Sequence, residues 1–227
     1  MIELGFFKML DRRLGIRNRI RGLPAAGFDL EGEKPLDWGW VVAHLPRSPR
    51  QHILDVGCCQ SPVIPAASAL GHEVVGIDTD RLPYEVPGVA FHQGDFLELD
   101  LGEVSFDVVV LCSVVEHIGL PGRYRQKNIP DGDLQAMEKT ARLLKPDGIV
   151  ILTVPVGVDM VFTPWHRIYG PGRLPRLIEG FSIESERCFV KQPGNPWRLA
   201  QRAEAMTFDG NGLSYALGQF VLKTRGG

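Results

Sequence analysis

The stretch from residue 52 to residue 61, HILDVGCCQS, constrains the fold of this chain more than any other segment. Ile53, Leu54 and Val56 are typical of a buried parallel strand, and Gly57 with the small residues after it indicates a turn that opens a helix at Pro62. Such a turn directs backbone N–H groups toward an anionic group and lets a ligand approach the main chain closely. Because Asp-x-Gly also occurs in turns without a ligand, the stretch by itself predicts a strand and a turn and leaves binding open.

Strand-like and helix-like segments alternate along the chain. Short apolar runs typical of buried strands occupy residues 53–56, 73–77, 89–92, 106–111 and 149–154. Helical patterns occupy residues 36–45, 62–70 and 132–144. This alternation predicts a mostly parallel sheet with helices on both faces, whose ligands bind beyond the carboxyl ends of the strands where the strand order reverses. The helix at residues 36–45 is expected to pack against the edge of the sheet.

The last part of the chain is less regular. It contains a predicted short helix at residues 171–179, a strand at 182–190, a helix around 199–206 and a closing strand at 213–224. The two strands are expected to pair antiparallel at the edge of the sheet.

Composition excludes several classes of protein. A formal net charge of -2 and a pI near 6.3 argue against a general nucleic-acid binder, because the chain has no bulk positive field to attract phosphate. The cysteines lack the paired spacing of a zinc site and an even spread of bridge partners, which fits a reducing compartment. They are Cys58, Cys59, Cys112 and Cys188. No signal peptide or membrane-spanning pattern is found, so we expect a cytoplasmic protein.

The first 22 residues mix apolar side chains with arginines and form an imperfect amphipathic helix pattern. One interpretation is peripheral contact with an anionic membrane surface through residues 1–22. The favoured interpretation is a helix packed over the ligand cleft as part of a lid, because Gly5 and Gly15 weaken the helix.

Acidic residues follow the second and third predicted strands. Asp78 lies 23 residues after Asp55, where a dinucleotide-type fold places a carboxylate that accepts hydrogen bonds from ribose hydroxyls. Asp95 and Phe96 follow the third strand, where a carboxylate or a backbone N–H could contact an adenine edge and the ring its face. The alternatives are a turn-capping carboxylate and a ring in the core.

Taken together, these residues resemble one family, the class I S-adenosylmethionine-dependent methyltransferases. The matching segments are ILDVGCCQS, GIDTD, GDFLELD, FDVVVLCSVVEHIG and ARLLKPDGIVILTVP, within residues 51–155. The resemblance implies a Rossmann-like three-layer α/β sandwich with a mostly parallel seven-stranded sheet and an antiparallel C-terminal strand. It also implies S-adenosyl-L-methionine as cofactor and S-adenosyl-L-homocysteine as product. A nicotinamide cofactor fits less well, because the third glycine of its fingerprint is absent.

Domain boundaries follow from the resemblance. Residues 51–227 are expected to form the methyltransferase domain, and residues 1–50 an N-terminal helical cap or lid. Insertions on the substrate side are expected near residues 120–132, 156–175 and 191–212.

The resemblance also implies roles for individual residues. Backbone groups of the first turn should face the methionine part of the cofactor, and acidic residues should order that turn and hold the ribose. The expected cofactor-binding residues are Asp55, Gly57, Cys58, Cys59, Asp78, Thr79, Asp95, Phe96, Cys112 and Ser113. The sequence departs from the family at Cys59, where a second glycine is usual, so the loop must keep a negative φ there or accept strain.

Methyl transfer from a sulfonium is an in-line displacement that depends mainly on positioning, but a sugar hydroxyl needs a base. His117 and His166 are the candidate catalytic residues; the alternative for each is a structural role.

The segments EHIGL, D-G-D and HRIYG resemble a methyltransferase subgroup of bacterial sugar and polysaccharide biosynthesis. We therefore expect O-methylation of a sugar or glycan intermediate. The alternatives are another small molecule, a quinone or lipid, or a cofactor-binding module without turnover.

Two further hypotheses concern charged residues. Glu116, Asp131 and Asp133 with a histidine could hold a divalent metal, although a turn and helix cap explain the pattern better, so no metal residue is assigned. A basic loop could bind a phosphate or carboxylate of the substrate, or be only solvated. It comprises Arg123, Tyr124, Arg125 and Lys127.

Overall fold

The computed structural model describes residues 32–48, 50–102, 105–122, 124, 126–192, 195–210 and 214–225. The chain divides into two compact units, Met1–Lys34 and Pro35–Gly227, and the fold described here is that of the second. The predicted amphipathic segment 1–22 lies outside the described residues, as do Arg123 and Arg125 of the predicted basic loop.

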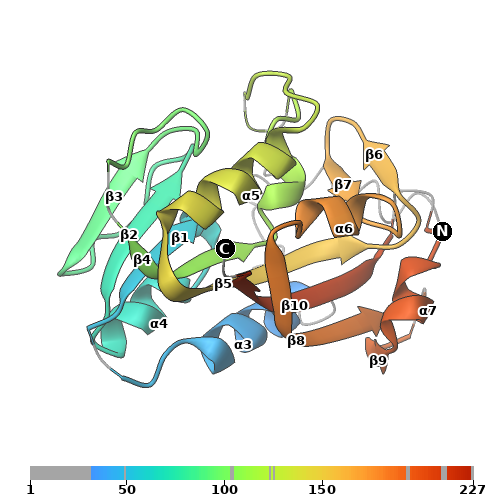
Figure 1. The fold of residues 1–227 in the computed structure, drawn as a ribbon, viewed down its shortest axis with the longest axis horizontal. Helices are drawn as coiled ribbons and strands as arrows, with labels where there is room; N and C mark the ends of the chain where they lie inside the picture. The colour runs from blue at the N-terminus through green and yellow to red at the C-terminus, as the bar shows by residue number, and fades with distance from the viewer. Residues whose placement is uncertain are drawn as a thin grey trace, which may run out of the picture. The chain divides into compact units, whose positions relative to one another are not determined.

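The predicted strands and helices form in the predicted order, although β2, β3 and β4 follow one another without a helix between them in the described residues (Figure 1). The strands are β1 His52–Val56, β2 Glu73–Asp78, β3 Val89–Gln93, β4 Phe106–Cys112, β5 Leu144–Val156, β6 Met160–Phe162, β7 His166–Ile168, β8 Phe181–Val190, β9 Arg198–Ala200 and β10 Ala216–Thr224. The helices are α3 Lys34–His44, α4 Val63–Ala69, α5 Gly132–Leu143, α6 Arg173–Leu177 and α7 Arg202–Met206, with 3₁₀ turns η1 Cys58–Gln60 and η2 Val115–His117.

Within the described residues the main sheet has eight strands in the order β3-β2-β1-β4-β5-β10-β8-β9. Strands β1 to β5 pair in parallel, whereas β10 is antiparallel to both β5 and β8. This arrangement confirms the predicted Rossmann-like α/β fold with antiparallel strands at the C-terminal end. The expected count of seven is one too low, because residues 198–200 pair with residues 188–190 as an edge strand, although a helix was predicted from residue 199.

Side chains along the central strands alternate between the two faces of the sheet. Val108 and Val110 of β4 belong to the core beneath α3 and α4, whereas Val109 and Leu111 belong to the core beneath α5 and α6. Period-two alternation with both faces buried explains why β4 reads as a continuous hydrophobic run.

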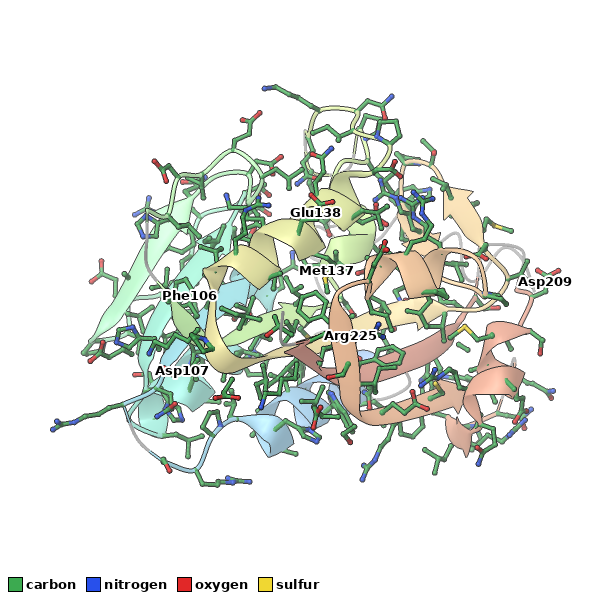
Figure 2. The ribbon with its side chains drawn as sticks, viewed as in Figure 1. Phe106, Asp107, Met137, Glu138, Asp209 and Arg225 are labelled. Carbon is green, nitrogen blue, oxygen red and sulfur yellow. The ribbon has the colours of Figure 1, made fainter. Side chains whose placement is uncertain are left out.

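Helix α5 shows how a helix covers one face of this sheet. Figure 2 shows Met137 directed toward the sheet and the neighbouring Glu138 directed away from it, and Met137 packs in the same core as Phe106. Polar residues on the outer face and apolar residues on the inner face are the pattern that predicted this helix.

The position of α3 differs from the prediction. Trp40 and Val41 are buried in the core that includes Ile151 and Val221, so α3 packs on a face of the sheet and not against its edge. The sequence pattern around Trp38 and Trp40 predicted a helix but gave no information on which strands this helix covers.

Strand order reverses between β1 and β4, because the chain adds β2 and β3 on one side of β1 and then β4 and β5 on the other. The turns after β1 and β4 therefore face the crevice where open α/β sheets bind ligands. Strands β6 and β7 form a separate antiparallel hairpin that follows β5. Among the described helices, none combines the length and apolar composition needed to cross a membrane.

Candidate functional site

The turn after β1 requires the glycine that the sequence places there. Gly57 has φ +78, and a Cβ atom on it would lie 2.7 Å from Cγ2 of Val114. Its N–H donates to the carbonyl of Ile77 at 2.7 Å, which joins the turn to the end of β2. Cys59 follows within η1, and it is not among the described non-glycine residues with positive φ. The absent second glycine therefore imposes no left-handed strain on this loop.

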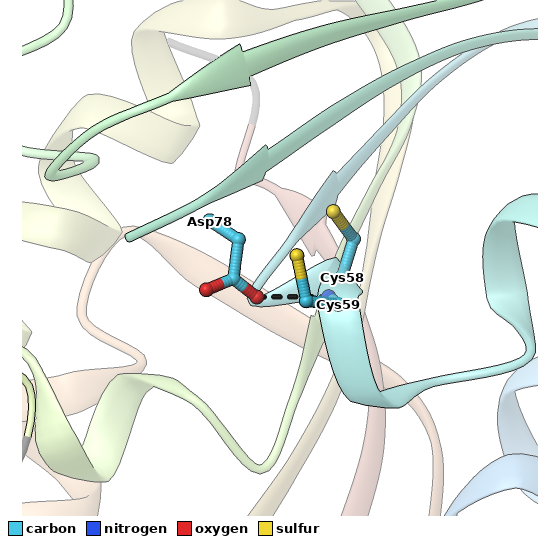
Figure 3. Close-up of side chains that lie close together, drawn as sticks. All are labelled: Cys58, Cys59 and Asp78. Atoms are coloured by element: carbon cyan, nitrogen blue, oxygen red, sulfur yellow. Dashed lines mark hydrogen bonds between the residues drawn. The ribbon is translucent and has the colours of Figure 1, made fainter. Parts of the chain in front are cut away.

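Asp78 holds the turn from the neighbouring strand. Its Oδ2 accepts a hydrogen bond from the N–H of Cys59 at 2.8 Å, and its Oδ1 accepts one from the N–H of Asp80 at 2.9 Å (Figure 3). Thr79 lies between them, and its carbonyl accepts a hydrogen bond from Nε2 of Gln93 at 3.1 Å. The structure thus brings the glycine turn and the predicted ribose-binding carboxylate together.

Asp55 lies behind the turn and is 1% exposed. Its Oδ2 accepts a hydrogen bond from the Ser61 hydroxyl at 3.2 Å, while its Oδ1 is buried with no hydrogen-bond partner among the described residues. Burial raises the pKa of Asp55 to about 8; the Ser61 hydroxyl opposes this rise, and the charge of Asp78 adds to it. At neutral pH this carboxyl group therefore mostly holds its proton.

Asp95 and Phe96 follow β3 at the same end of the sheet. Asp95 is half-buried, and its Oδ1 accepts a hydrogen bond from the N–H of Leu97 at 2.9 Å, which is the capping role considered for it. Phe96 is 3% exposed and packs in the core, with Nζ of Lys139 5.0 Å from its ring centroid. The side chain of Asp95 therefore lines this end of the sheet, whereas the Phe96 ring belongs to the core.

Cys112 is the last residue of β4, and Ser113 follows it. Ser113 adopts φ 50, and its hydroxyl donates to Oδ2 of Asp37 at 2.7 Å. The same carboxylate lies 3.5 Å from Nε2 of Gln219, and the hydroxyls of Ser113 and Thr153 are 3.4 Å apart. Residues from α3, β4, β5 and β10 thus form one polar cluster beside the predicted cofactor turn.

Asp37 was not predicted from the sequence, although it is fully buried. A signal for it exists: Asp37, Trp40 and Val41 have the i, i+3, i+4 spacing of one helix face, so a carboxylate lies on the apolar side of α3. A buried carboxylate on such a face needs polar partners from another element, and Ser113 and Gln219 supply them.

His117, the first candidate base, lies at the end of η2. Its Nδ1 donates to the carbonyl of Trp165 at 2.5 Å, since a carbonyl oxygen only accepts. Its Nε2 lies 3.6 Å from Oε1 of Glu116, and its ring contacts Tyr124 edge-on at 5.2 Å between centroids. The Trp165 carbonyl therefore fixes the tautomer and leaves Nε2 as the basic nitrogen of the neutral ring.

His166, the second candidate, begins β7 in the hairpin. Its ring lies 5.8 Å from that of Phe162 and 5.3 Å from that of Tyr215, measured between centroids. Aromatic contacts thus hold His166 between the hairpin and the residues that lead into β10.

The EHIGL, D-G-D and HRIYG segments meet in a buried ionic network around Asp133. Both carboxylate oxygens of Asp133 accept hydrogen bonds from Arg173, at 2.6 and 2.9 Å, and the Tyr169 hydroxyl donates at 3.1 Å. The fully buried guanidinium of Arg167 donates to the carbonyls of Ile118 at 2.7 Å and Pro130 at 3.1 Å. These contacts join the loop after β4 to α5, β7 and α6.

This network bears on the metal hypothesis. Asp133 is occupied by Arg173 and Tyr169, and the four predicted ligands do not form a potential metal-binding group in the described part of the chain. The only such group among the described residues consists of Cys58, Cys59 and Asp78.

Comparisons with known proteins agree with this architecture. A family model described as "Caenorhabditis protein of unknown function, DUF268" matches residues 98–211, which include the ionic network. A protein of Mycolicibacterium smegmatis named as a probable S-adenosylmethionine-dependent methyltransferase is 26% identical over 157 residues, covering 63% of this chain and 56% of that protein. The chain spans about half the length of the curated relatives that it matches.

Two solved structures share the fold. The 1,6-didemethyltoxoflavin-N1-methyltransferase of Burkholderia thailandensis, solved with 1,6-didemethyltoxoflavin and S-adenosylhomocysteine, has a TM-score of 0.58 at 19% identity, covering 98% of this chain and 88% of that one. The N-methyltransferase NodS of Bradyrhizobium japonicum, in complex with S-adenosylhomocysteine, has a TM-score of 0.59 at 11% identity, covering 94% of this chain and 98% of that one. These likenesses confirm the predicted methyltransferase-type fold.

Asp55 should make stability depend on pH. Its pKa is raised from 3.8 to about 8 in the folded state, so between these values the unfolded chain loses a proton that the folded chain keeps. This group therefore lowers stability as pH rises through that range and has no further effect above it. We expect Asp55→Asn, which cannot ionise, to gain thermal stability relative to the wild type as pH rises from about 5 to about 9. Circular dichroism melts at several pH values measure this; the exposed Asp80→Asn serves as control, and a pH-independent difference would contradict the prediction.

Loss of the Asp133 side chain should strongly destabilise the protein. Asp133→Ala leaves the cations of Arg167 and Arg173 without their buried partner, so the free energy of unfolding should fall by about 3–5 kcal/mol. Asp131→Ala is the matched control, because Asp131 also contacts Arg173 but its side chain is 52% exposed, and it should cost at most about 1 kcal/mol. Urea denaturation measures both values; equal losses would show that the buried network contributes no more than a surface ion pair.

Proposed function

The chain belongs to the family described as "Caenorhabditis protein of unknown function, DUF268", and we propose that this member is an S-adenosylmethionine-dependent methyltransferase. The observation that carries the proposal is the pairing of the Gly57 turn with Asp78 at the reversal of strand order. The name of the mycobacterial relative and the fold shared with two methyltransferases that bind S-adenosylhomocysteine support it.

The residues at this edge fit the proposed cofactor. Each oxygen of Asp78 accepts one backbone hydrogen bond and retains a lone pair for a ribose hydroxyl. The buried Oδ1 of Asp55, which has no hydrogen-bond partner among the described residues, suits a donor such as the ammonium of the methionine part. Asp95 and the backbone N–H of Phe96 would contact the adenine edge, and Thr79 would line the ribose wall. Gly57, Cys58 and Cys59 would supply the main chain beside the methionine part, with Cys112 and Ser113 below the sulfonium.

When bound, S-adenosylmethionine supplies an electrophilic methyl group on a sulfonium. The residues of the chain then need to hold the acceptor opposite the leaving sulfur and to exclude water. Ser113 lies at the end of β4, beside the predicted cofactor turn, and Asp37 fixes its hydroxyl. This hydrogen bond orients the Ser113 side chain, beside which we expect the acceptor to lie.

We propose a polar acceptor, namely a hydroxyl of a sugar or glycan-biosynthesis intermediate. The polar cluster of Asp37, Ser113, Thr153 and Gln219 supports this choice, because polar side chains beside the predicted cofactor turn suit a hydroxyl acceptor better than an apolar one such as a quinone. A nitrogen acceptor on another small molecule is the first alternative, since both structural neighbours are named as N-methyltransferases.

A sugar hydroxyl is a poor nucleophile until it loses its proton. His117 is the proposed proton acceptor: the Trp165 carbonyl holds its Nδ1 proton, so Nε2 receives the proton, and the carboxylate of Glu116 stabilises the imidazolium formed. His166, held between Phe162 and Tyr215, is the other candidate and would act from the hairpin side.

A cofactor-binding module without turnover is the alternative from a different class. Calorimetry with S-adenosylhomocysteine and a turnover assay separate the two. Formation of S-adenosylhomocysteine from S-adenosylmethionine over a panel of sugars, nucleotide sugars and amines supports the enzyme. Tight binding without product over the whole panel supports the module.

Asp78 should contribute strongly to cofactor affinity. We expect Asp78→Asn to weaken S-adenosylhomocysteine binding by about 10- to 100-fold, because hydrogen bonds to a charged group contribute about 1.5–3 kcal/mol. Titration calorimetry measures this loss. Asp80→Asn is the matched control, since the hydrogen bonds of Asp80 to this loop use its backbone N–H and carbonyl, and its affinity should equal that of the wild type. Equal affinity in Asp78→Asn would remove Asp78 from the ribose site.

The two histidines should affect turnover more than cofactor binding. With an acceptor identified from the panel, His117→Ala and His166→Ala should each lower kcat by about 10²–10⁴-fold if the residue is the base, because that is the typical contribution of a positioned acid or base. Affinity for S-adenosylhomocysteine should stay within a few-fold of the wild type. Unchanged kcat in both variants would refute general-base catalysis by histidine.

A further inference from the structure

Two thiols and a carboxylate converge beside the turn after β1. One ligand atom from each of Cys58, Cys59 and Asp78 lies within 4.8 Å of the other two. Figure 3 shows the two cysteines leaving adjacent positions of η1 with their sulfur atoms on the same side, above the carboxylate of Asp78 at the end of β2. The hydrogen bond from the Cys59 N–H to Asp78 holds the two elements at this separation.

The spacing suits a small tetrahedral metal ion. Zinc–sulfur bonds of about 2.3 Å in a tetrahedral site place two sulfur atoms about 3.8 Å apart, so the three ligand atoms need to move by at most about 1 Å to close on an ion. Cys58 is fully buried and forms the inner wall, whereas Cys59 and Asp78 are half-buried and form the open side. An open fourth position would hold water.

The inner wall has room for Cys58 because the neighbouring strand carries a glycine. A Cβ atom on Gly76 would lie 2.9 Å from Sγ of Cys58 and 2.6 Å from Cδ1 of Ile64. Gly76 thereby leaves space for the sulfur atom beside β2.

The chemistry of the three ligands favours a thiophilic cation. Soft sulfur ligands select zinc, cadmium or cobalt over magnesium or calcium, and Asp78 adds a carboxylate oxygen beside the two sulfur atoms. On binding, each thiol forms a sulfur–metal bond and releases its proton to water, so one dication replaces two protons without any redox change.

We propose that Cys58, Cys59 and Asp78 form a binding site for a thiophilic divalent cation of the zinc class. The metal site itself is independent of the proposed methyltransferase activity. The effect of the metal ion on cofactor binding rests on that proposed function. A metal ion bound to Asp78 would occupy the carboxylate that is proposed to hold the ribose, so the cation and the nucleoside would compete for Asp78.

Cobalt(II) is a spectroscopic probe for the site, because thiolate-to-cobalt charge transfer absorbs in the near ultraviolet. Titration of the reduced, tag-free protein should give a saturable band at one cobalt per chain. Cys59→Ser and Asp78→Asn should each weaken cobalt affinity by at least about 10-fold, since even outer-shell partners of a metal site contribute about 10- to 100-fold. Cys59 is only half-buried, so its variant is expected to fold, which melting curves check.

Cys188→Ser is the matched control, because Cys188 is a buried free cysteine on β8, outside the cluster. It should retain the band and the affinity of the wild type. Absence of a charge-transfer band, or an equal band in Cys59→Ser, would overturn the metal site.

Competition is tested separately by calorimetry. Saturating zinc should weaken S-adenosylhomocysteine binding to the wild type by at least about 10-fold and leave Cys59→Ser nearly unaffected. Equal nucleoside affinity with and without zinc would overturn the competition. If the metal-free protein binds no S-adenosylhomocysteine, the proposed function fails, and the cobalt band still decides whether the metal site exists.

Discussion

The parallel pairing of β1 with β4 is the contact on which the site depends. It places residues 53–56 beside residues 108–111, although β2 and β3 lie between them in the chain. Because the strand order reverses at this pair, the turns after both strands open toward one crevice. Gly57 and Ser113 thus lie at neighbouring strand ends, and each has a positive φ that directs its turn away from the strand.

The second constraint is the ionic network around Asp133. The segment between β4 and α5 contains little regular structure, so its backbone carbonyls need donors from elsewhere. Arg167 supplies these donors, and Asp133 compensates the charges of Arg167 and Arg173. An irregular loop thereby obtains a defined position over the carboxyl ends of the strands. The matched family model covers residues 98–211, so the family's shared sequence includes this network and not the turn at Gly57.

Sequence patterns predicted the longer strands, including the partly exposed β3 and β8, and missed the three-residue strands β6, β7 and β9. Strand β4 is apolar along nearly its whole length because both faces are covered, and it was predicted almost to the residue. Strand β9 has the sequence RLA and exposed side chains, so only its pairing with β8 identifies it. Among the site residues, Asp78 could be predicted because an acidic residue at the end of an apolar strand is visible in the local sequence. The partnership of Asp37 with Ser113 joins residues far apart in the chain and has no local signal beyond a carboxylate on an apolar helix face.

Asp37 also links α3 to the sheet across the predicted domain boundary at residue 50. All five cofactor-type segments lie after residue 50, and a boundary based on them would cut between α3 and β1. Such a cut would keep every recognisable motif and remove the carboxylate that holds the end of β4. It would also uncover the face of the sheet on which Trp40 and Val41 lie. A buried charge in a helix without a motif therefore ties α3 to the sheet that carries the motifs.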